Sequence, residues 1–152
     1  MSRRRDIILV VDDEGKDLRL MADALAEQGY SVLKATSYDS AMSVFEQQDA
    51  PITLLVSDIS LPGKNGCELA KAILKRDPGI KVLFVSGHVG AEVCKFYGIP
   101  VSDLHFLRKP FEPAGLAVRV EEVLRSPETV QTLVANGTPA KRSAGDDSQA
   151  RR

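Results

Sequence analysis

The sequence is poor in cysteine, in net charge and in long hydrophobic runs, and each shortage excludes a class of protein. Its two cysteines, Cys67 and Cys94, have no C-x-x-C spacing and no nearby histidine, which argues against a zinc site. Small buried thiols are the simpler interpretation, and they fit a reducing compartment. The net charge of -1 gives no reason to expect attraction to nucleic acid or to a membrane surface.

The hydrophobic runs are short. The first one follows the N-terminal arginines and is interrupted after five residues by Asp12, Asp13 and Glu14, which is too early for a signal peptide. No run approaches the roughly 18 apolar residues of a transmembrane helix. We therefore expect a soluble, cytoplasmic protein.

The length of 152 residues predicts a single domain, and the sequence contains no internal repeat. We expect residues 1–5 to form a flexible fringe and residues 6–126 to form the domain. Residues 127–152 become small, polar and charged, so they cannot bury enough apolar surface to fold and should form a flexible tail.

Apolar runs alternate with helical patterns along the domain. Five short runs are expected to be strands: Ile7–Val11, Ser31–Ala35, Thr53–Ser57, Lys81–Val85 and Leu104–Leu107. Five helices are expected between and after them: at about 16–28, after a cap at Thr36 or Ser37, at about 66–75, at about 89–97 and from Pro113. This alternation predicts an α/β fold, a doubly wound parallel sheet with helices on both faces and right-handed crossovers.

The most informative stretch is Leu54 to Gly66. It begins as a buried strand and places a carboxylate, Asp58, where that strand ends. Pro62 and Gly63 then mark a loop, and Asn65 with Glu68 resembles the capping box that begins a helix. Asp58 by itself could be an ordinary turn residue.

The other strand ends also carry polar residues. The first strand is followed by Asp12 and Asp13, the fourth by Ser86 and the fifth by Lys109. In the flavodoxin-like strand order 2-1-3-4-5, the ligand crevice lies between the first and third strands, so the three acids would converge there. Each residue alone fits an ordinary turn, but their joint occurrence at successive strand ends favours a functional site.

Three converging carboxylates need a positive partner. Two such charges about 4 Å apart repel by roughly 4 kcal/mol at an effective dielectric of 20. An all-oxygen ligand set suits Mg²⁺ or Mn²⁺. A phosphoryl group on one of the acids would in addition give Lys109 and the Ser86 hydroxyl a partner to neutralise and to bind.

The segment from Asp6 to about Arg125 resembles the receiver domains of bacterial two-component response regulators. The resemblance is carried by four motifs: V-V-D-D-E at Val10–Glu14, L-L-V-S-D-I-S-L-P-G-K-N-G at Leu54–Gly66, V-S-G at Val85–Gly87 and K-P-F at Lys109–Phe111. It implies a signalling domain, either single or of the hybrid-kinase type. It does not imply an enzyme beyond self-catalysed phosphotransfer and autodephosphorylation.

The resemblance assigns the chemistry to particular residues. It implies that Asp58 accepts a phosphoryl group from a histidine kinase or a histidine phosphotransfer protein. Mg²⁺ would be held by Asp13, Asp58 and the backbone carbonyl of Ser60, with Asp12 assisting through water. Ser86 and Lys109 would contact the phosphoryl group.

The resemblance also implies a switch. Phe106, three residues before Lys109, stands where receivers carry an aromatic residue that turns inward on activation. Ser86 and Phe106 would thus be the two switch residues. The surface of the fourth helix, fifth strand and fifth helix would then change its contacts with an output protein. The Lys109-Pro110 peptide bond is expected to be cis. Apart from the resemblance, His88 and His105 have no metal-ligand spacing and are expected to lie at the surface or the crevice rim.

Two alternatives remain open from the sequence. An aspartyl-phosphate phosphatase would need a second acid two residues after the nucleophile, where this chain has Ser60. A receiver-like interaction module would work without phosphate, although all five expected side chains are present. No room for a DNA-binding domain is apparent after Ser126, so the output is expected to be a protein contact or a phosphate relay. The kinase, the output partner and the oligomeric state are not determined by the sequence.

Overall fold

The computed structural model of the chain describes residues 6–87, 90–99 and 103–127. The predicted N-terminal fringe, His88 and all but the first residue of the predicted tail therefore lie outside the described residues. Within the described part of the chain, no helix is long and apolar enough to cross a membrane.

Five parallel strands form one sheet in the order β2-β1-β3-β4-β5, as the sequence predicted. The strands are β1 (Ile7–Val11), β2 (Ser31–Ala35), β3 (Leu54–Asp58), β4 (Lys81–Ser86) and β5 (Phe106–Arg108). The helices are α1 (Gly15–Glu27), α2 (Tyr38–Gln47), α3 (Gly66–Arg76), α4 (Gly90–Phe96) and α5 (Pro113–Arg125). This is the flavodoxin-like doubly wound fold.

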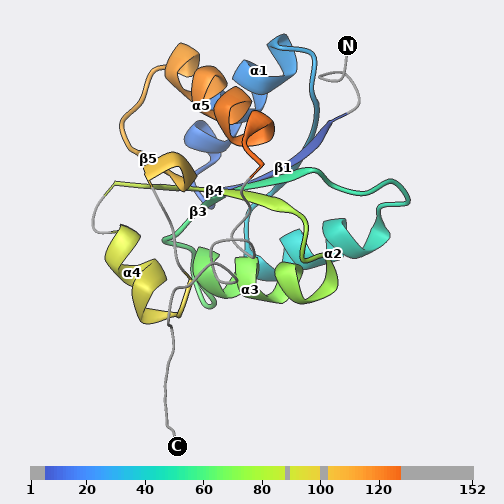
Figure 1. Ribbon diagram of the computed structural model, residues 1–152, viewed down its shortest axis with the longest axis vertical. Helices are drawn as coiled ribbons and strands as arrows, with labels where there is room; N and C mark the ends of the chain where they lie inside the picture. Colours follow the sequence, from blue (N-terminus) through green and yellow to red (C-terminus); the bar gives the residue numbers. More distant parts are fainter. Residues whose placement is uncertain (1–5, 88–89, 100–102, 128–152) are drawn as a thin grey trace, which may run out of the picture.

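The helices cover the two faces of the sheet as two layers. Helices α1 and α5 lie on one face, and α2, α3 and α4 lie on the other (Figure 1). The side chains of each central strand alternate between the layers: Leu54 and Val56 pack toward α1 and α5, whereas Leu55 packs toward α3. Because both faces are covered, β3 is buried along its whole length, which explains the continuous apolar run Leu54–Val56 in its first part.

The fifth strand differs from the prediction. We expected it at Leu104–Leu107, but Leu104 and His105 belong to a short 3₁₀ helix, η2 (Asp103–His105), and β5 begins at Phe106. The expectation that His105 lies at the surface or the crevice rim was wrong, since only 1% of its surface is exposed. The 3₁₀ turn replaces the alternation of a strand with three residues per turn, and the predicted side-chain directions therefore do not apply there.

The start of α3 agrees with the sequence in detail. The Asn65 side chain accepts from the Glu68 backbone N–H, and the Glu68 carboxylate accepts from the Asn65 N–H, both at 2.9 Å. Gly66 follows at the first helical position, so close to β3 that an added Cβ would lie 2.2 Å from the Asp58 carbonyl oxygen. The capping box and the glycine together hold α3 directly against the end of β3.

Candidate functional site

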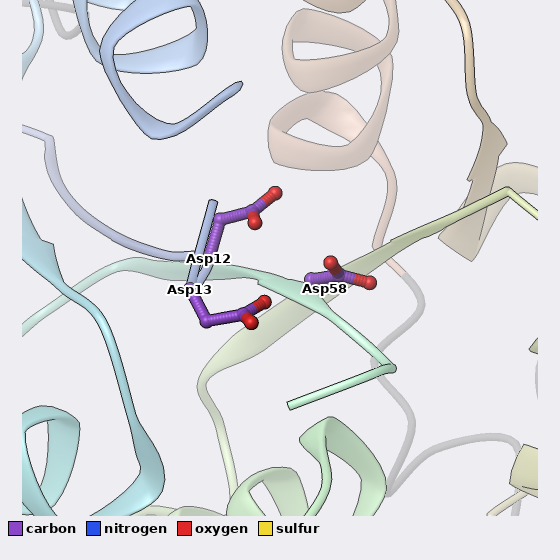
Figure 2. Close-up of side chains that lie close together, drawn as sticks. All are labelled: Asp12, Asp13 and Asp58. Carbon is purple, nitrogen blue, oxygen red and sulfur yellow. The ribbon is translucent and has the colours of Figure 1, made fainter. Parts of the chain in front are cut away.

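Three aspartates meet at the carboxyl edge of the sheet. Val11 on β1 pairs with Ser57 on β3, so the residues that follow them, Asp12 and Asp58, lie on neighbouring strands. Figure 2 shows the side chains of Asp12, Asp13 and Asp58 projecting from these two strand ends into a common space. One carboxylate oxygen from each lies within 4.8 Å of the others. The structure thus brings together the acids that the sequence placed in one crevice.

Burial makes this cluster energetically demanding. Asp12 is fully buried and Asp58 is 6% exposed, whereas Asp13 is exposed. Burial raises the pKa of Asp12 above the ordinary value for a carboxyl group, although hydrogen bonds from Lys109 and from the Glu14 backbone N–H counteract part of the effect. Buried carboxylates require compensating positive charge or hydrogen bonds.

Short backbone hydrogen bonds orient the two buried carboxylates. One Asp12 oxygen accepts from the Glu14 N–H at 2.9 Å, and Asp58 Oδ1 accepts from the Ser60 N–H at 3.0 Å. Ser60 itself is exposed at the start of the loop after β3. Its backbone, rather than its hydroxyl, is therefore the part that fixes the position of Asp58.

Lys109 supplies the positive charge. Its Nζ lies 2.8 Å from Asp12 Oδ2, 3.1 Å from Asp17 Oδ2 and 3.2 Å from Asp58 Oδ2. Burial alone would lower the pKa of Lys109, but the hydrogen bonds to Asp12 and Asp17 outweigh it and raise the pKa above its usual range. Lys109 is consequently a permanent cation that links β1, α1 and β3 to the loop after β5.

Asp17 is the member of this cluster that the sequence reasoning missed. It lies in the first turn of α1, where an acidic residue already has an ordinary explanation in its interaction with the helix dipole. The sequence position of Asp17 could have predicted its place at the site. Helix α1 begins shortly after Asp12 and Asp13, so its first turn lies at the rim of the same crevice.

Ser86 and Lys109 are joined through the backbone. Ser86 is the buried last residue of β4, and its carbonyl oxygen accepts from the Lys109 N–H at 2.8 Å. The Lys109-Pro110 peptide bond is cis, as the resemblance implied. The ends of β4 and β5 are thus held together beside the acids.

Phe106 lies outside the charged cluster. It is the half-buried first residue of β5, which is an edge strand, and it is paired in register with Phe84 of β4. Its backbone carbonyl accepts from Nη1 of Arg119 on α5 at 2.7 Å. This bond connects the edge of the sheet to α5.

The donor set at the acid cluster fits a hard divalent cation. Two aspartate side chains just after β1 and one at the end of β3 present oxygen atoms only, and the exposure of Asp13 leaves one side open to water. Mg²⁺ prefers oxygen ligands and keeps several of its waters. The residues present would therefore accept Mg²⁺, although Lys109 already contacts one oxygen of Asp12 and one of Asp58.

The family model of the response regulator receiver domain matches residues 8–121. The chain belongs to this family. Receiver domains act in two-component signal transduction, generally bind Mg²⁺ at an acidic pocket, and take phosphate from histidine kinases or phosphotransfer proteins.

Known receivers resemble the chain over most of its length. The chain is 32% identical over 118 residues to the response regulator receiver protein CpdR of Brucella abortus, and the match covers 77% of this chain and 95% of that protein. It is 34% identical over 118 residues to the sensor kinase CckA of Brucella abortus, covering 77% of this chain but 12% of the kinase. It spans 48% of the length of the aerobic respiration control protein ArcA of Escherichia coli, at 32% identity.

Solved structures agree with this assignment. A response regulator receiver protein from Sinorhizobium medicae superposes with a TM-score of 0.70 at 29% identity, covering 81% of this chain and 97% of that one. The receiver domain of the hybrid histidine kinase CckA superposes with a TM-score of 0.64 at 33% identity, covering 78% of this chain and 99% of that one. These matches include a response regulator receiver protein and a receiver domain taken from a hybrid kinase.

Proposed function

We propose that the chain is the phosphoryl-accepting partner of a histidine kinase or a histidine phosphotransfer protein, with Asp58 as the acceptor. The single observation that carries this proposal is the placement of Lys109 Nζ between Asp12 and Asp58 at 2.8 and 3.2 Å. A lone metal site would gain nothing from a cation already seated between two of its ligands. A site that receives a phosphoryl group needs that positive charge for the incoming oxygens.

In the proposed step, a carboxylate oxygen of Asp58 attacks the phosphorus of a phosphohistidine. The new bond is oxygen to phosphorus, the bond that breaks is nitrogen to phosphorus, and its electron pair returns to the imidazole. The Ser60 N–H, 3.0 Å from Asp58 Oδ1, holds the carboxylate in place during the attack. Catalysis therefore consists of positioning and charge neutralisation.

Mg²⁺ would be held by Asp13, Asp58 and the Ser60 carbonyl, with Asp12 acting through water, and would supply positive charge to the phosphoryl oxygens. Lys109 and the Ser86 hydroxyl contact those oxygens in the phosphorylated protein. Lys109 then exchanges its carboxylate partners for the phosphoryl group, which carries close to two negative charges.

The output is proposed to be a change in protein contacts. Ser86 and Phe106 are the proposed switch residues, and β5 is an edge strand of the sheet beside α4 and α5. Phe96 on α4 is 83% exposed and Val118 on α5 is 57% exposed, so both helices present apolar side chains to a partner. Phosphorylation biases an equilibrium between two arrangements of this surface.

The decisive test is intact mass spectrometry after incubation with acetyl phosphate and Mg²⁺. We expect one phosphoryl adduct on the unmodified protein, none after removal of Mg²⁺, and none on Asp58→Asn. Asp49→Asn changes an exposed aspartate elsewhere and should leave the adduct intact. An unmodified mass for the native protein in the presence of Mg²⁺ would refute the proposal in favour of a phosphate-independent interaction module.

A further inference from the structure

Two buried thiols touch each other between α3 and α4. Cys67 is the second residue of α3 and Cys94 lies on α4, and both side chains are fully buried. Their sulfur atoms are 3.2 Å apart although 27 positions separate them in the chain. The two helices lie next to each other on the same face of the sheet (Figure 1).

The two thiols in this contact differ in the direction of their pKa shifts. The hydrogen bond with Cys94 lowers the pKa of Cys67 and outweighs the effect of burial, whereas the same bond and burial raise the pKa of Cys94. Cys67 also lies in the first turn of α3, and a helix N-terminus favours a thiolate. The position of Cys67 at the helix N-terminus favours it as the nucleophile of the pair, and Cys94, with its sulfur 3.2 Å away, is positioned to resolve the oxidised form.

We propose that Cys67 and Cys94 form an oxidation site that closes into an intramolecular disulfide when the protein reacts with hydrogen peroxide. The Cys67 thiolate attacks one peroxide oxygen, the O–O bond breaks, and the leaving hydroxide takes up a proton to become water. Cys94 then attacks the sulfenic sulfur of Cys67, its thiol proton and the sulfenic hydroxyl leaving as water. Two thiols and one hydrogen peroxide thus give one disulfide and two waters.

The proposed disulfide would bind α4 to α3. Helix α4 has only seven residues, and its Phe96 faces solvent, so Cys94 is one of the few side chains that anchor it inward. Local opening of such a short helix gives a small oxidant access to the pair. Gly66, directly before Cys67, touches the Asp58 backbone, and α4 follows the strand that ends in Ser86. Oxidation would therefore restrain the element next to the proposed switch.

Formation of the disulfide is independent of the proposed phosphoryl transfer. A positive result on the thiols would stand even if Asp58 accepted no phosphate. The experiment therefore measures the reactivity of the two thiols and the hydrogen exchange of α4, and it needs no phosphodonor.

The full chain would first be reduced, then treated with hydrogen peroxide, unfolded and alkylated. We expect both thiols to become unreactive together, with a mass lower by two hydrogen atoms, and dithiothreitol to restore both. After oxidation of Cys94→Ala, dimedone should label Cys67 as a sulfenic acid, whereas Cys94 should stay reduced in Cys67→Ala. Loss of the two thiols one at a time, or disulfides between chains, would overturn the proposal.

Hydrogen exchange of the segment Gly90–Ile99 tests the restraint. Exchange in the oxidised native protein should be slower than in the reduced protein, and peroxide should leave the exchange of Cys94→Ala unchanged. Equal exchange rates in a protein shown to carry the disulfide would contradict the restraint of α4.

Discussion

The ammonium group of Lys109 lies 3.1 Å from Oδ2 of Asp17, so a carboxylate on α1 shares the lysine that also contacts the proposed phosphoryl acceptor. Asp17 is more exposed than its partners, with 38% of its side chain accessible. It is not among the oxygen atoms that cluster for a cation. Its role at the site is therefore to hold Lys109 and to add negative charge.

We expect Asp17→Asn to be phosphorylated faster by acetyl phosphate. The substitution frees Lys109 from one of three competing carboxylates and removes a charge that repels the incoming phosphodonor. A partly exposed pair contributes about 0.2–1 kcal/mol, so the rate should rise by a factor of roughly 1.4 to 5. Asp23→Asn, an exposed aspartate farther along α1, is the matched control and should leave the rate unchanged. A slower Asp17→Asn protein would mean that Asp17 is needed to position Lys109.

Lys109→Met should destabilise the protein most strongly when Mg²⁺ is absent. The change leaves Asp12 and Asp58 buried without their cation, which should lower the free energy of unfolding by about 2–3 kcal/mol. Addition of Mg²⁺ should recover most of this loss, because the ion no longer competes with the lysine. Urea unfolding with and without Mg²⁺ measures both effects, and Lys71→Met on the exposed face of α3 controls for loss of a lysine. If Mg²⁺ does not reduce the loss in free energy of unfolding, the ion does not bind at the carboxylates of Asp12 and Asp58.

Gly66→Ala should be costly because its new methyl group has no space. The atoms it would meet are backbone atoms of Asp58 and Ile59, at 2.2 to 3.0 Å, and these cannot move without displacing the end of β3. We expect a loss of roughly 2–3 kcal/mol in the free energy of unfolding, measured by urea denaturation. Gly15 occupies the same first position in α1 with no neighbour within 4 Å, so Gly15→Ala should be neutral or stabilising by up to about 1 kcal/mol. Equal effects of the two substitutions would contradict the close approach of α3 to β3.

Phe106→Trp would report directly on the proposed switch. The sequence contains no tryptophan, so the new indole would be the sole one in the protein. Phe106 is half-buried, and if it turns inward on activation, phosphorylation should shift the emission to shorter wavelengths. The same substitution in the Asp58→Asn background should show no shift with acetyl phosphate. An unchanged spectrum in a phosphorylated protein would remove Phe106 from the switch.

Much of the fold was predictable because local and long-range preferences agree. The runs Ile7–Val11 and Leu54–Val56 are apolar on both faces, and that pattern fits only strands covered from two sides. Asn65 and Glu68 form the capping box that their spacing predicted. The convergence of the acids then followed from the strand order, because parallel strands bring their carboxyl ends to one edge.

The errors arise where local sequence allows two structures. The run Leu104–Leu107 has the composition of a strand, yet its first half forms a 3₁₀ turn, and that choice depends on how the chain returns to the sheet edge. Asp17 and the Cys67–Cys94 contact were missed for a related reason. Both depend on how a helix is rotated against its neighbours, which periodicity predicts only to within a face.

The position of Lys109 in the sequence also has a consequence for synthesis. Asp58 precedes it by 51 residues, so a ribosome adding about 5–20 residues each second completes the acid cluster roughly 3–10 s before the lysine is made. During that interval, any nascent chain in which β1 and β3 already pair has to compensate its buried carboxylates with protons or with cations from solution. The emergence of Lys109 ends this dependence, and the strand that delivers the lysine also completes the edge of the sheet. The order of translation thus makes the built-in cation available only after all three acids have been synthesised.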